Sequence, residues 1–598
     1  MTIRAIAGLA ALHLFFLGVG AGVLWGLRGW RFWTDAARLA GLAYLLGVSG
    51  VVVVLTLALV VGIPFGPPLV AGSGAALVAA ALLAGRWKRR PRPAPRPPGW
   101  TLPAPSFLGA LFIAALVLYF EGSFRSERLA ELYDWDAWFT WTLKAKTLFH
   151  FGGLEEWIFG GSAYSGGVYT GYPPGFSVLQ AAGFHAIGTD DVVTSNLNYW
   201  FFTLGFAAAV AGLLAPRVRS LVLLPALLLM LVLPGFTGIP VPGGAERPLA
   251  FLVAVAALLV FLWLEERQGW QLGAAALLLA GAFLTKREGL LLGACVLVAA
   301  FAASWGERRR AWPRLAATAG AAFALALPWR IWVAAQGYRG DEPEAGLFGF
   351  LEDLDRGPPS LWLAVRAMFG YDFWLVLPAV VVAAAILAFA AGARKAAVFT
   401  LAFLAATALA NAWVTWTHPS LGLTLDYSLN PATRFMVTPL LVVAALLPLL
   451  LERAWAGRDR MPPGPTPGVG APPNRLLPWT IVLAALLVYP ASMASGYSSF
   501  RLPGGAPPFP SRTECEQAPG VGEPVRVVFG YERSYPEANA VRDRARAAGF
   551  ETAEVARDGC GRLRVFVGDV PSIEAGEKLV GQARAADLEA TLERDPGD

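Results

Sequence analysis

The stretch that decides the fold is LAGLAYLLGVSGVVVVLTLALVVGI, which runs from Leu39 to Ile63. It contains no charged residue and no proline, and it is longer than the roughly 20 apolar residues that a helix needs to cross a bilayer. Further blocks along the chain have the same character. The sequence therefore predicts an α-helical integral membrane protein.

The composition agrees with this prediction. Of 598 residues, 56% are hydrophobic and 15% are charged, whereas soluble proteins are about a quarter charged. We attribute the net charge of +6 to cytoplasmic loops and expect no nucleic-acid partner. Cys295, Cys515 and Cys560 form no Cys/His cluster, so no zinc site is predicted. We expect no required cofactor; a divalent cation is possible but not indicated.

The apolar blocks predict about 14 membrane helices. Besides Leu39–Ile63, they are Ala5–Leu27, Pro68–Gly85, Phe107–Phe120, Asn196–Ala215, Leu221–Pro234, Pro248–Leu264, Leu272–Leu284, Leu290–Trp305, Leu315–Val333, Phe373–Ala390, Ala396–Trp416, Phe435–Leu451 and Trp479–Ser495.

Basic residues between these blocks predict the orientation, because cytoplasmic loops are rich in Lys and Arg. All of them fall on one side only if Tyr172–Ile187 dips into the membrane surface without crossing. The segments Glu121–Asn196 and Gln336–Tyr371 and the C-terminal domain then face outward. We expect a multi-pass protein of the cell (inner or plasma) membrane. The basic groups are Arg86–Arg96, Arg217/Arg219, Arg308–Arg310 with Arg314, Arg394/Lys395 and Arg453/Arg458/Arg460.

The richest outer segment reads YDWDAWFTW from Tyr133 to Trp141 and is followed by Lys144 and Lys146. It is predicted to form an amphipathic helix at the membrane surface. Two interpretations of Asp134 and Asp136 stay open. A carboxylate at a helix start can cap free N–H groups, or it can accept a proton from an acceptor hydroxyl.

Further charges lie at helix ends on the same predicted side. Glu246 precedes a helix, where a dipole partner and a catalytic carboxylate are both compatible with the pattern. Thr285–Gly289 (TKREG) places three ionisable residues between apolar blocks, which is costly unless they face a cavity or the interface. Arg330 and Arg434 lie at predicted outer ends of spans, where snorkelling is the default interpretation. Together these cations would suit an anionic phosphate ligand.

The order of these motifs resembles that of a known enzyme group. The acidic segment, the turn Tyr172-Pro173-Pro174, Ala245–Ala250 (AERPLA) and Leu284–Gly289 (LTKREG) follow one another as in GT-C glycosyltransferases of the protein mannosyltransferase and lipid A aminoarabinose transferase type. The resemblance covers residues 107–451 and is carried by order and placement. This chain has Asp134-Trp135-Asp136 where many members have adjacent Asp-Glu, and three extra helices precede the usual first one.

The resemblance implies an inverting glycosyltransferase that moves a sugar from a polyprenyl-phosphate donor to an acceptor hydroxyl or phosphate on the outer face. It makes Asp136 the best candidate for the essential acid, with Asp134 and Glu246 as further catalytic candidates. The partners it implies are the polyprenyl-phosphate-linked sugar and membrane lipids. The candidate substrate-binding residues are Lys144, Lys146, Tyr172, Lys286, Arg287, Glu288, Arg330 and Arg434.

After the last span, the sequence predicts a small α+β domain. Its element order, βαββαβ, is a ferredoxin-like pattern. Two halves repeat at an offset of 38 residues, since Arg526–Gly530 (RVVFG) matches Arg564–Gly568 (RVFVG). The predicted elements are a strand at Val525–Phe529, a helix at Pro536–Ala548, strands at Glu551–Ala556 and Arg562–Val567, a helix at Ser572–Ala585 and a strand at Asp587–Glu593.

This order, length and repeat resemble the SPOR-type peptidoglycan-binding domain, which implies glycan binding through residues 525–598. A generic ferredoxin-like module without glycan binding stays open. An outer location would let Cys515 and Cys560 pair. The predicted division is 1–106 for extra helices and a basic loop, 107–499 for the GT-C-like module with its outer loop 121–196, 500–524 for a linker and 525–598 for the SPOR-like domain.

Two other function classes compete with the enzyme. A transporter or flippase of a lipid-linked or anionic substrate should carry ionisable residues at mid-membrane on broken helices, often in repeated halves. Here the charged candidates crowd the predicted outer loops, and the spans show no repeat. A protein that only anchors the C-terminal domain would not need so many helices.

Overall fold

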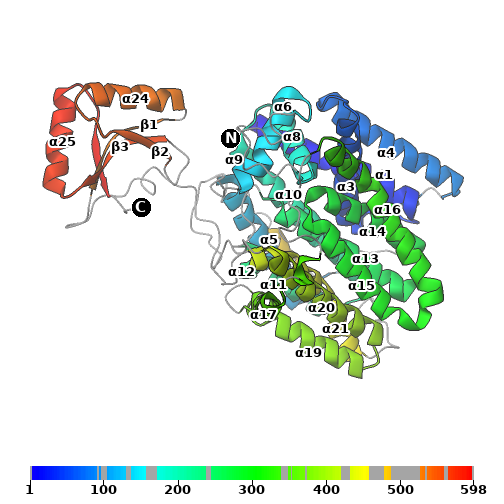
Figure 1. The fold of residues 1–598 in the computed structure, drawn as a ribbon. Helices are drawn as coiled ribbons and strands as arrows, with labels where there is room; N and C mark the ends of the chain where they lie inside the picture. Colours follow the sequence, from blue (N-terminus) through cyan, green and yellow to red (C-terminus); the bar gives the residue numbers. More distant parts are fainter. Residues whose placement is uncertain are drawn as a thin grey trace. The chain divides into compact units, whose positions relative to one another are not determined.

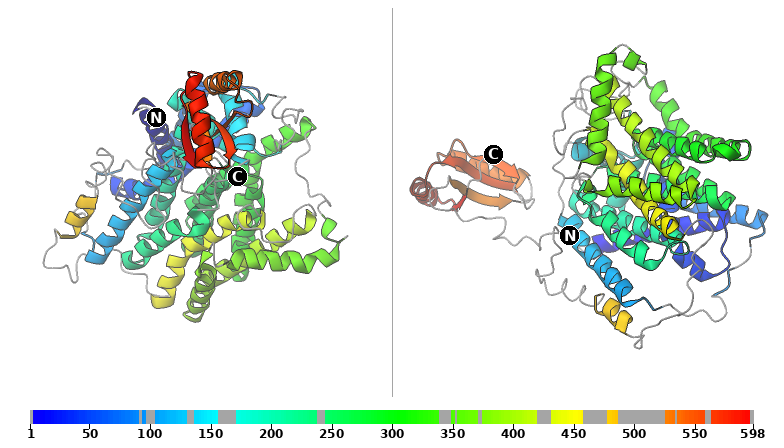
Figure 2. Two further views of the ribbon diagram at one scale, coloured as in Figure 1. Left: turned by 90° about the vertical axis from the view of Figure 1, so that its left-hand side faces the viewer. Right: turned by 90° about the horizontal axis from the view of Figure 1, so that it is seen from below.

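The computed structural model describes residues 3–90, 93–95, 104–129, 136–155, 171–237, 244–337, 348–351, 353–370, 374–418, 431–456, 477–485, 525–532, 535–557 and 563–594. Contacts divide the chain into two compact units, Met1–Pro490 and Ala491–Asp598. The first is a bundle of helices and the second a small α+β domain (Figures 1 and 2).

Nine helices within the described residues are long and apolar enough to cross a membrane. This supports a multi-pass membrane protein. They are built on α1 (Ile3–Leu27), α3 (Ala40–Val60), α4 (Pro67–Trp87), α5 (Phe107–Leu129), α10 (Leu197–Leu214), α13 (Glu246–Glu266), α16 (Arg308–Ala335), α20 (Arg394–Thr417) and α21 (Pro431–Ala456).

Four shorter apolar helices accompany them, so the predicted total of about 14 spans stays a prediction. They are α11 (Ser220–Val232), α14 (Gly269–Thr285), α15 (Glu288–Ala303) and α19 (Leu377–Ala390). The last predicted span, Trp479–Ser495, is described only over residues 477–485, which are helical.

Short helical segments connect the long ones. The α-helical segments are α2 (Trp33–Arg38), α6 (Leu143–Phe151), α8 (Gly175–Ile187), α9 (Val192–Ser195), α12 (Pro234–Thr237) and α17 (Gly357–Phe369). The others are the π-helix η1 (Asp136–Thr142) and the 3₁₀ turns η3 (Trp305–Glu307), η4 (Gly349–Leu351) and η5 (Leu354–Arg356).

The helix α5 continues well beyond Phe120, where the apolar block ends. The sequence placed Glu121 at the start of an outer loop, but this residue lies inside the helix. Its carboxylate pairs with Arg125 one turn later, and both side chains are buried. Internal i,i+4 pairing and burial by neighbouring helices stabilise a helical end that hydropathy alone does not predict.

The N-terminal helices pack in backbone contact, which requires glycine. A Cβ on Gly20 of α1 would lie 1.6 Å from the Ala43 carbonyl oxygen, and one on Gly47 of α3 would lie 1.8 Å from that of Phe16. Small residues allow such close approach between membrane helices. Because α3 also packs against α10 and α14, residues of the predicted 1–106 segment form part of the first unit.

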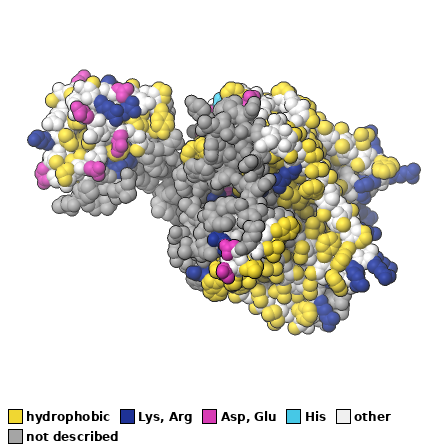
Figure 3. All heavy atoms as spheres, in the orientation of Figure 1, with side chains coloured by type: hydrophobic (Ala, Val, Ile, Leu, Met, Phe, Trp, Pro, Cys, Tyr) yellow, Lys and Arg dark blue, Asp and Glu magenta, His cyan; other side chains and the backbone are white. Residues whose placement is uncertain are grey.

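Three residues from the basic groups predicted to be cytoplasmic lie at one end of the bundle, near the C-terminus of α13. Arg453 pairs with Glu265 at 2.8 Å, Arg217 pairs with Glu266, and the Lys395 ammonium lies near the Leu264 carbonyl. We call this the basic end. Figure 3 shows a row of Lys and Arg side chains along the right-hand and lower edges of this unit. The N-terminus of α13, about 30 Å away along the helix, carries Glu246.

The second unit contains the predicted element order. It runs β1 (Val525–Glu532), α24 (Tyr535–Ala547), β2 (Glu554–Arg557), β3 (Leu563–Val570), α25 (Ile573–Ala585) and β4 (Thr591–Arg594). The sheet order is β2-β3-β1-β4, and neighbouring strands are antiparallel. Alternate residues of β1 and β3 form one core with both helices. Cys515 and Cys560 lie outside the described residues.

Candidate functional site

A buried ion cluster occupies the N-terminal end of α13. Lys286 has an extended backbone between α14 and α15, so its side chain leaves the helix pair at the break. Its ammonium lies 3.0 Å from a carboxylate oxygen of Glu246 and 2.9 Å from one of Glu288. The Lys286 and Glu246 side chains are only 10% and 5% exposed. Burial of this kind is tolerated because each charge has an opposite partner.

Arg434 completes the cluster from the first turn of α21. Its guanidinium lies 2.5 Å from the same Glu246 oxygen that accepts from Lys286. One carboxylate thus joins three separate parts of the bundle. Two cations stabilise the ionised carboxylate, which makes Glu246 a poor proton acceptor. The geometry therefore favours Glu246 as the residue that positions Lys286 and Arg434.

Tyr172 connects this cluster to the segment that follows the acidic motif. Its ring centre lies 6.0 Å from the Lys286 ammonium, and its carbonyl accepts a hydrogen bond of 3.2 Å from the buried Lys144. The Trp141 ring packs edge-on against Tyr172, and Ser177 donates to the Trp141 carbonyl at 2.9 Å. As predicted, the two prolines form a turn before an apolar helix, and α8 begins directly after them.

The acidic motif itself is only partly described. Asp134 lies outside the described residues. Asp136 is the first residue of η1, and its side chain is also outside the described part. The predicted helix is present, but it starts as a π-helix and continues as α6. Such turns are rare and are often found at functional sites.

The remaining predicted cations divide into two groups. Lys146 is not brought to the cluster; its ammonium pairs with Asp190 at 2.9 Å, and both side chains are partly exposed. Arg287 directly follows Lys286 and precedes the first residue of α15, and Arg330 is a partly buried residue near the C-terminal end of α16.

A second buried ion pair was not predicted. Arg247 pairs with Glu127 near the end of α5, and its guanidinium lies 5.3 Å from the ring centre of Tyr199. The Tyr199 hydroxyl donates to the Gly244 carbonyl. The pair ties the end of α5 to the start of α13, next to Glu246. A glutamate so soon after an apolar block was the only sequence signal for it.

Several buried polar atoms of the cluster lack partners among the described residues. They are the second carboxylate oxygens of Glu246 and Glu288 and the hydroxyl of Thr433, the residue before Arg434. Buried polar groups normally have hydrogen-bond partners. These atoms could bind the hydroxyl groups of a polar ligand.

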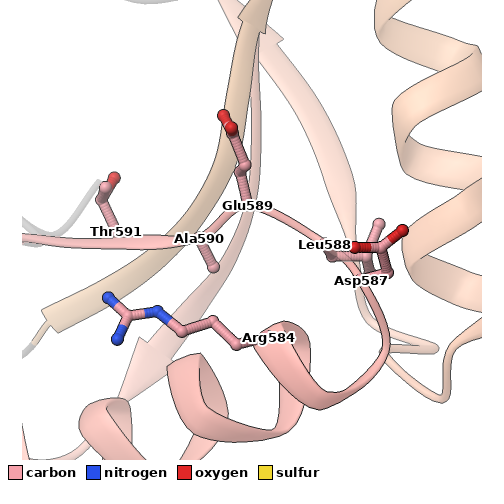
Figure 4. A pocket seen from close by; sticks show the side chains of 6 residues that line it. All are labelled: Arg584, Asp587, Leu588, Glu589, Ala590 and Thr591. Atoms are coloured by element: carbon pink, nitrogen blue, oxygen red, sulfur yellow. The ribbon is translucent and has the colours of Figure 1, made fainter.

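The second unit has a shallow pocket of its own where α25 leads into β4. Arg584 and Glu589 line it together with Asp587 and Thr591 (Figure 4). Its lining side chains are mostly exposed, and none of them was a candidate from the sequence. We assign it no role.

Searches of protein families, of curated proteins and of solved structures find no match to this chain.

Proposed function

We propose that this chain is a membrane glycosyltransferase. It transfers a sugar from a polyprenyl-phosphate donor to an acceptor hydroxyl or phosphate at the Glu246 end of the bundle, which we assign to the outer face of the cell membrane. The observation that carries this proposal is the buried cluster of Glu246, Lys286 and Arg434, joined through Tyr172 to the helix that Asp136 begins. Ionisable residues buried in a membrane protein are costly and are usually retained for function.

The charge balance of the cluster indicates where the donor phosphate binds. Glu246 and Glu288 already offset the charges of Lys286 and Arg434. Arg287 and Arg330 are two further guanidinium groups, and an anion bound by both would be stabilised by charge-assisted hydrogen bonds. Arginine also suits phosphate because its planar fork of N–H donors can contact two oxygens. We assign the phosphate to this pair.

The transfer step needs one base and one stabilised leaving group. The acceptor oxygen attacks the anomeric carbon, and the bond from that carbon to the phosphate oxygen breaks. When the acceptor is a hydroxyl, its proton passes to a carboxylate, which we assign to Asp136. The polyprenyl phosphate leaves with the bond's electron pair, and the Arg287–Arg330 pair stabilises its charge.

One observation favours the alternative of a transporter for a lipid-linked or anionic substrate. Lys286 is buried at a break between two short helices, as substrate sites of transporters often are. A single experiment separates the two functions. Purified protein is incubated with a panel of polyprenyl-phosphate sugars and a cell-envelope extract that supplies the acceptor, and free polyprenyl phosphate is measured. The enzyme releases it, and Asp136→Asn does not. Movement of intact donor across a vesicle membrane without release would support the transporter.

For the second unit we propose a ferredoxin-like fold of the SPOR type that binds peptidoglycan. Supporting this is the sheet face that carries Arg564, whose largely buried guanidinium lies 5.7 Å from the ring centre of Tyr531 and 6.0 Å from that of Phe566. Aromatic rings beside cations suit sugars and charged glycan groups. In sedimentation with isolated peptidoglycan, Arg564→Ala should lower binding of the full chain, and Arg544→Ala on the exposed surface of α24 should not. Equal binding by all three proteins would contradict this proposal.

A further inference from the structure

The helix α17 lies within residues 336–371, which the sequence assigned to an outer loop. It has 13 residues and carries Pro358 and Pro359 in its first turn. Its length of about 20 Å is too short to cross the roughly 30 Å of a bilayer core. One face, including Leu363 and Ala367, is buried against α20 and α21.

The opposite face is apolar as well. Leu361, Trp362 and Phe369 are 43%, 64% and 44% exposed. The exposed Arg366 lies between them on the same stripe, one turn after Trp362. A helix that packs on a protein core normally presents a polar face to water. Large exposed apolar side chains in a row indicate a nonpolar partner.

Hydrogen bonds fix α17 at a known end of the bundle. Arg356, just before the helix, donates to the carbonyls of Thr415 and His418 at 3.1 and 3.2 Å. The Trp416 indole N–H donates to the Asp353 carbonyl at 2.6 Å. These contacts hold α17 at the C-terminal end of α20, opposite the end where Lys395 lies. It therefore lies at the Glu246 end.

A neighbouring apolar helix begins beside α17. The Trp374 indole N–H, just before α19, donates to the Ala367 carbonyl of α17 at 2.8 Å. Val376, just before α19, is 58% exposed, and Val380 and Leu387 within α19 are 40% and 59% exposed. Because α19 is wholly apolar and packs against the candidate spans α20 and α21, its exposed face is suited to lipid. This face begins next to α17, so lipid is the occupant that we assign to the α17 stripe as well.

We propose that α17 lies flat in the lipid–water interface at the Glu246 end. Leu361, Trp362 and Phe369 enter the acyl region, and Arg366 extends to the lipid phosphates. Interfacial helices combine such an apolar stripe with cations, and tryptophan prefers this depth. The inference goes beyond the proposed transferase activity and does not depend on it.

The test places spin labels on single cysteines in the full chain in lipid nanodiscs, after Cys295, Cys515 and Cys560 are replaced. Collision with oxygen reports lipid exposure, and collision with a water-soluble nickel complex reports water exposure. Labels at Trp362→Cys and Phe369→Cys should collide more with oxygen than with nickel. Asp355→Cys, on the exposed turn η5, should show the reverse, and the buried Ala364→Cys should be shielded from both reagents.

Two outcomes would overturn the proposal. Labels at positions 362 and 369 that collide with nickel as often as the label at 355 would place the stripe in water. Labels shielded from both reagents, as at 364, would mean that a protein surface covers it, either another part of this chain or a second copy. Both substitutions remove exposed side chains, and agreement between two positions guards against a local disturbance. No substrate is needed, so the result is independent of the transferase test.

Discussion

Each end of the helical bundle has a glutamate that bridges two cations, but the two sites differ in burial. At the basic end Glu307 pairs with Lys395 at 2.5 Å and with Arg267, and its side chain is 44% exposed. At the other end Glu246 pairs with Lys286 and Arg434 and is 5% exposed. Exposed pairs contribute about 0–1 kcal/mol, whereas buried charges are expensive unless all are paired. This difference is consistent with our proposal that the Glu246 cluster serves the transfer reaction, whereas the Glu307 pairs lie on a surface rich in cations.

The largest expected effect is on catalysis at the Glu246 end. Asp136→Asn should lower the release of polyprenyl phosphate by about 100- to 10,000-fold, because the acceptor loses its base. Glu307→Gln, at the basic end, should leave release unchanged. If Asp134→Asn is the inactive variant and Asp136→Asn is not, the role moves to Asp134. Activity in both would refute the mechanism.

The next effect compares the two glutamates directly by stability. Glu246→Ala leaves Lys286 and Arg434 buried without their shared counter-ion, so the free energy of unfolding should fall by about 3–5 kcal/mol. Glu307→Ala should cost less than about 1 kcal/mol. Denaturant unfolding in detergent measures both. Equal losses in the free energy of unfolding would show that burial does not make the Glu246 pairs more important for stability than the Glu307 pairs.

A smaller effect concerns the donor phosphate. Arg330→Glu should weaken binding of undecaprenyl phosphate by about tenfold or more, since a hydrogen bond to a charged group contributes about 1.5–3 kcal/mol. Arg309→Glu, an equal charge change on the exposed start of α16, serves as the control. Native mass spectrometry of the purified protein measures binding. Equal losses of binding in both variants would show that the effect comes from the change in net charge and not from a contact with Arg330.

The smallest effect concerns the exposed pair of Lys146 and Asp190. Burial raises the pKa of Asp190, but the hydrogen bond and charge of Lys146 outweigh it, so the pKa lies below its usual value. A depressed folded-state pKa contributes stability above the unfolded value of about 3.9, and this contribution is lost as pH falls through the folded value. Asp190→Asn should therefore lower the melting temperature slightly at pH 7, with a difference that shrinks below pH 4. A difference independent of pH would exclude an ionic cause.

The sequence predicted the fold well where periodicity and hydropathy act alone. Each of the first thirteen apolar blocks coincides with a helix, and the strands and helices of the second unit appear in the predicted order. It failed where tertiary contacts decide. The buried pair of Glu121 and Arg125 stabilises the extension of α5 beyond its apolar block. The short helix α17 forms in a segment that the sequence assigned to a loop. Short helices that pack against others have no strong local signal.

The site was predicted in part for the same reason. Tyr172, Lys286 and Arg434 were named from motifs, and the structure brings them together with Glu246. The pairing of Lys286 and Arg434 through the Glu246 carboxylate could not be predicted from the sequence, because these residues lie far apart in the chain. The Arg247 pair with Glu127 was missed because hydropathy treats a charge at the end of a block as a boundary.

The most direct test of the account asks which side of the membrane each end of the bundle faces. Single cysteines are introduced at two exposed positions, Thr189→Cys before α9 and Arg309→Cys at the basic end, in a chain without other cysteines. Intact cells are treated with a membrane-impermeant thiol reagent. The account predicts that Thr189→Cys reacts in intact cells and that Arg309→Cys reacts only after lysis. The reverse pattern would place the Glu246 cluster in the cytoplasm and contradict transfer at the outer face.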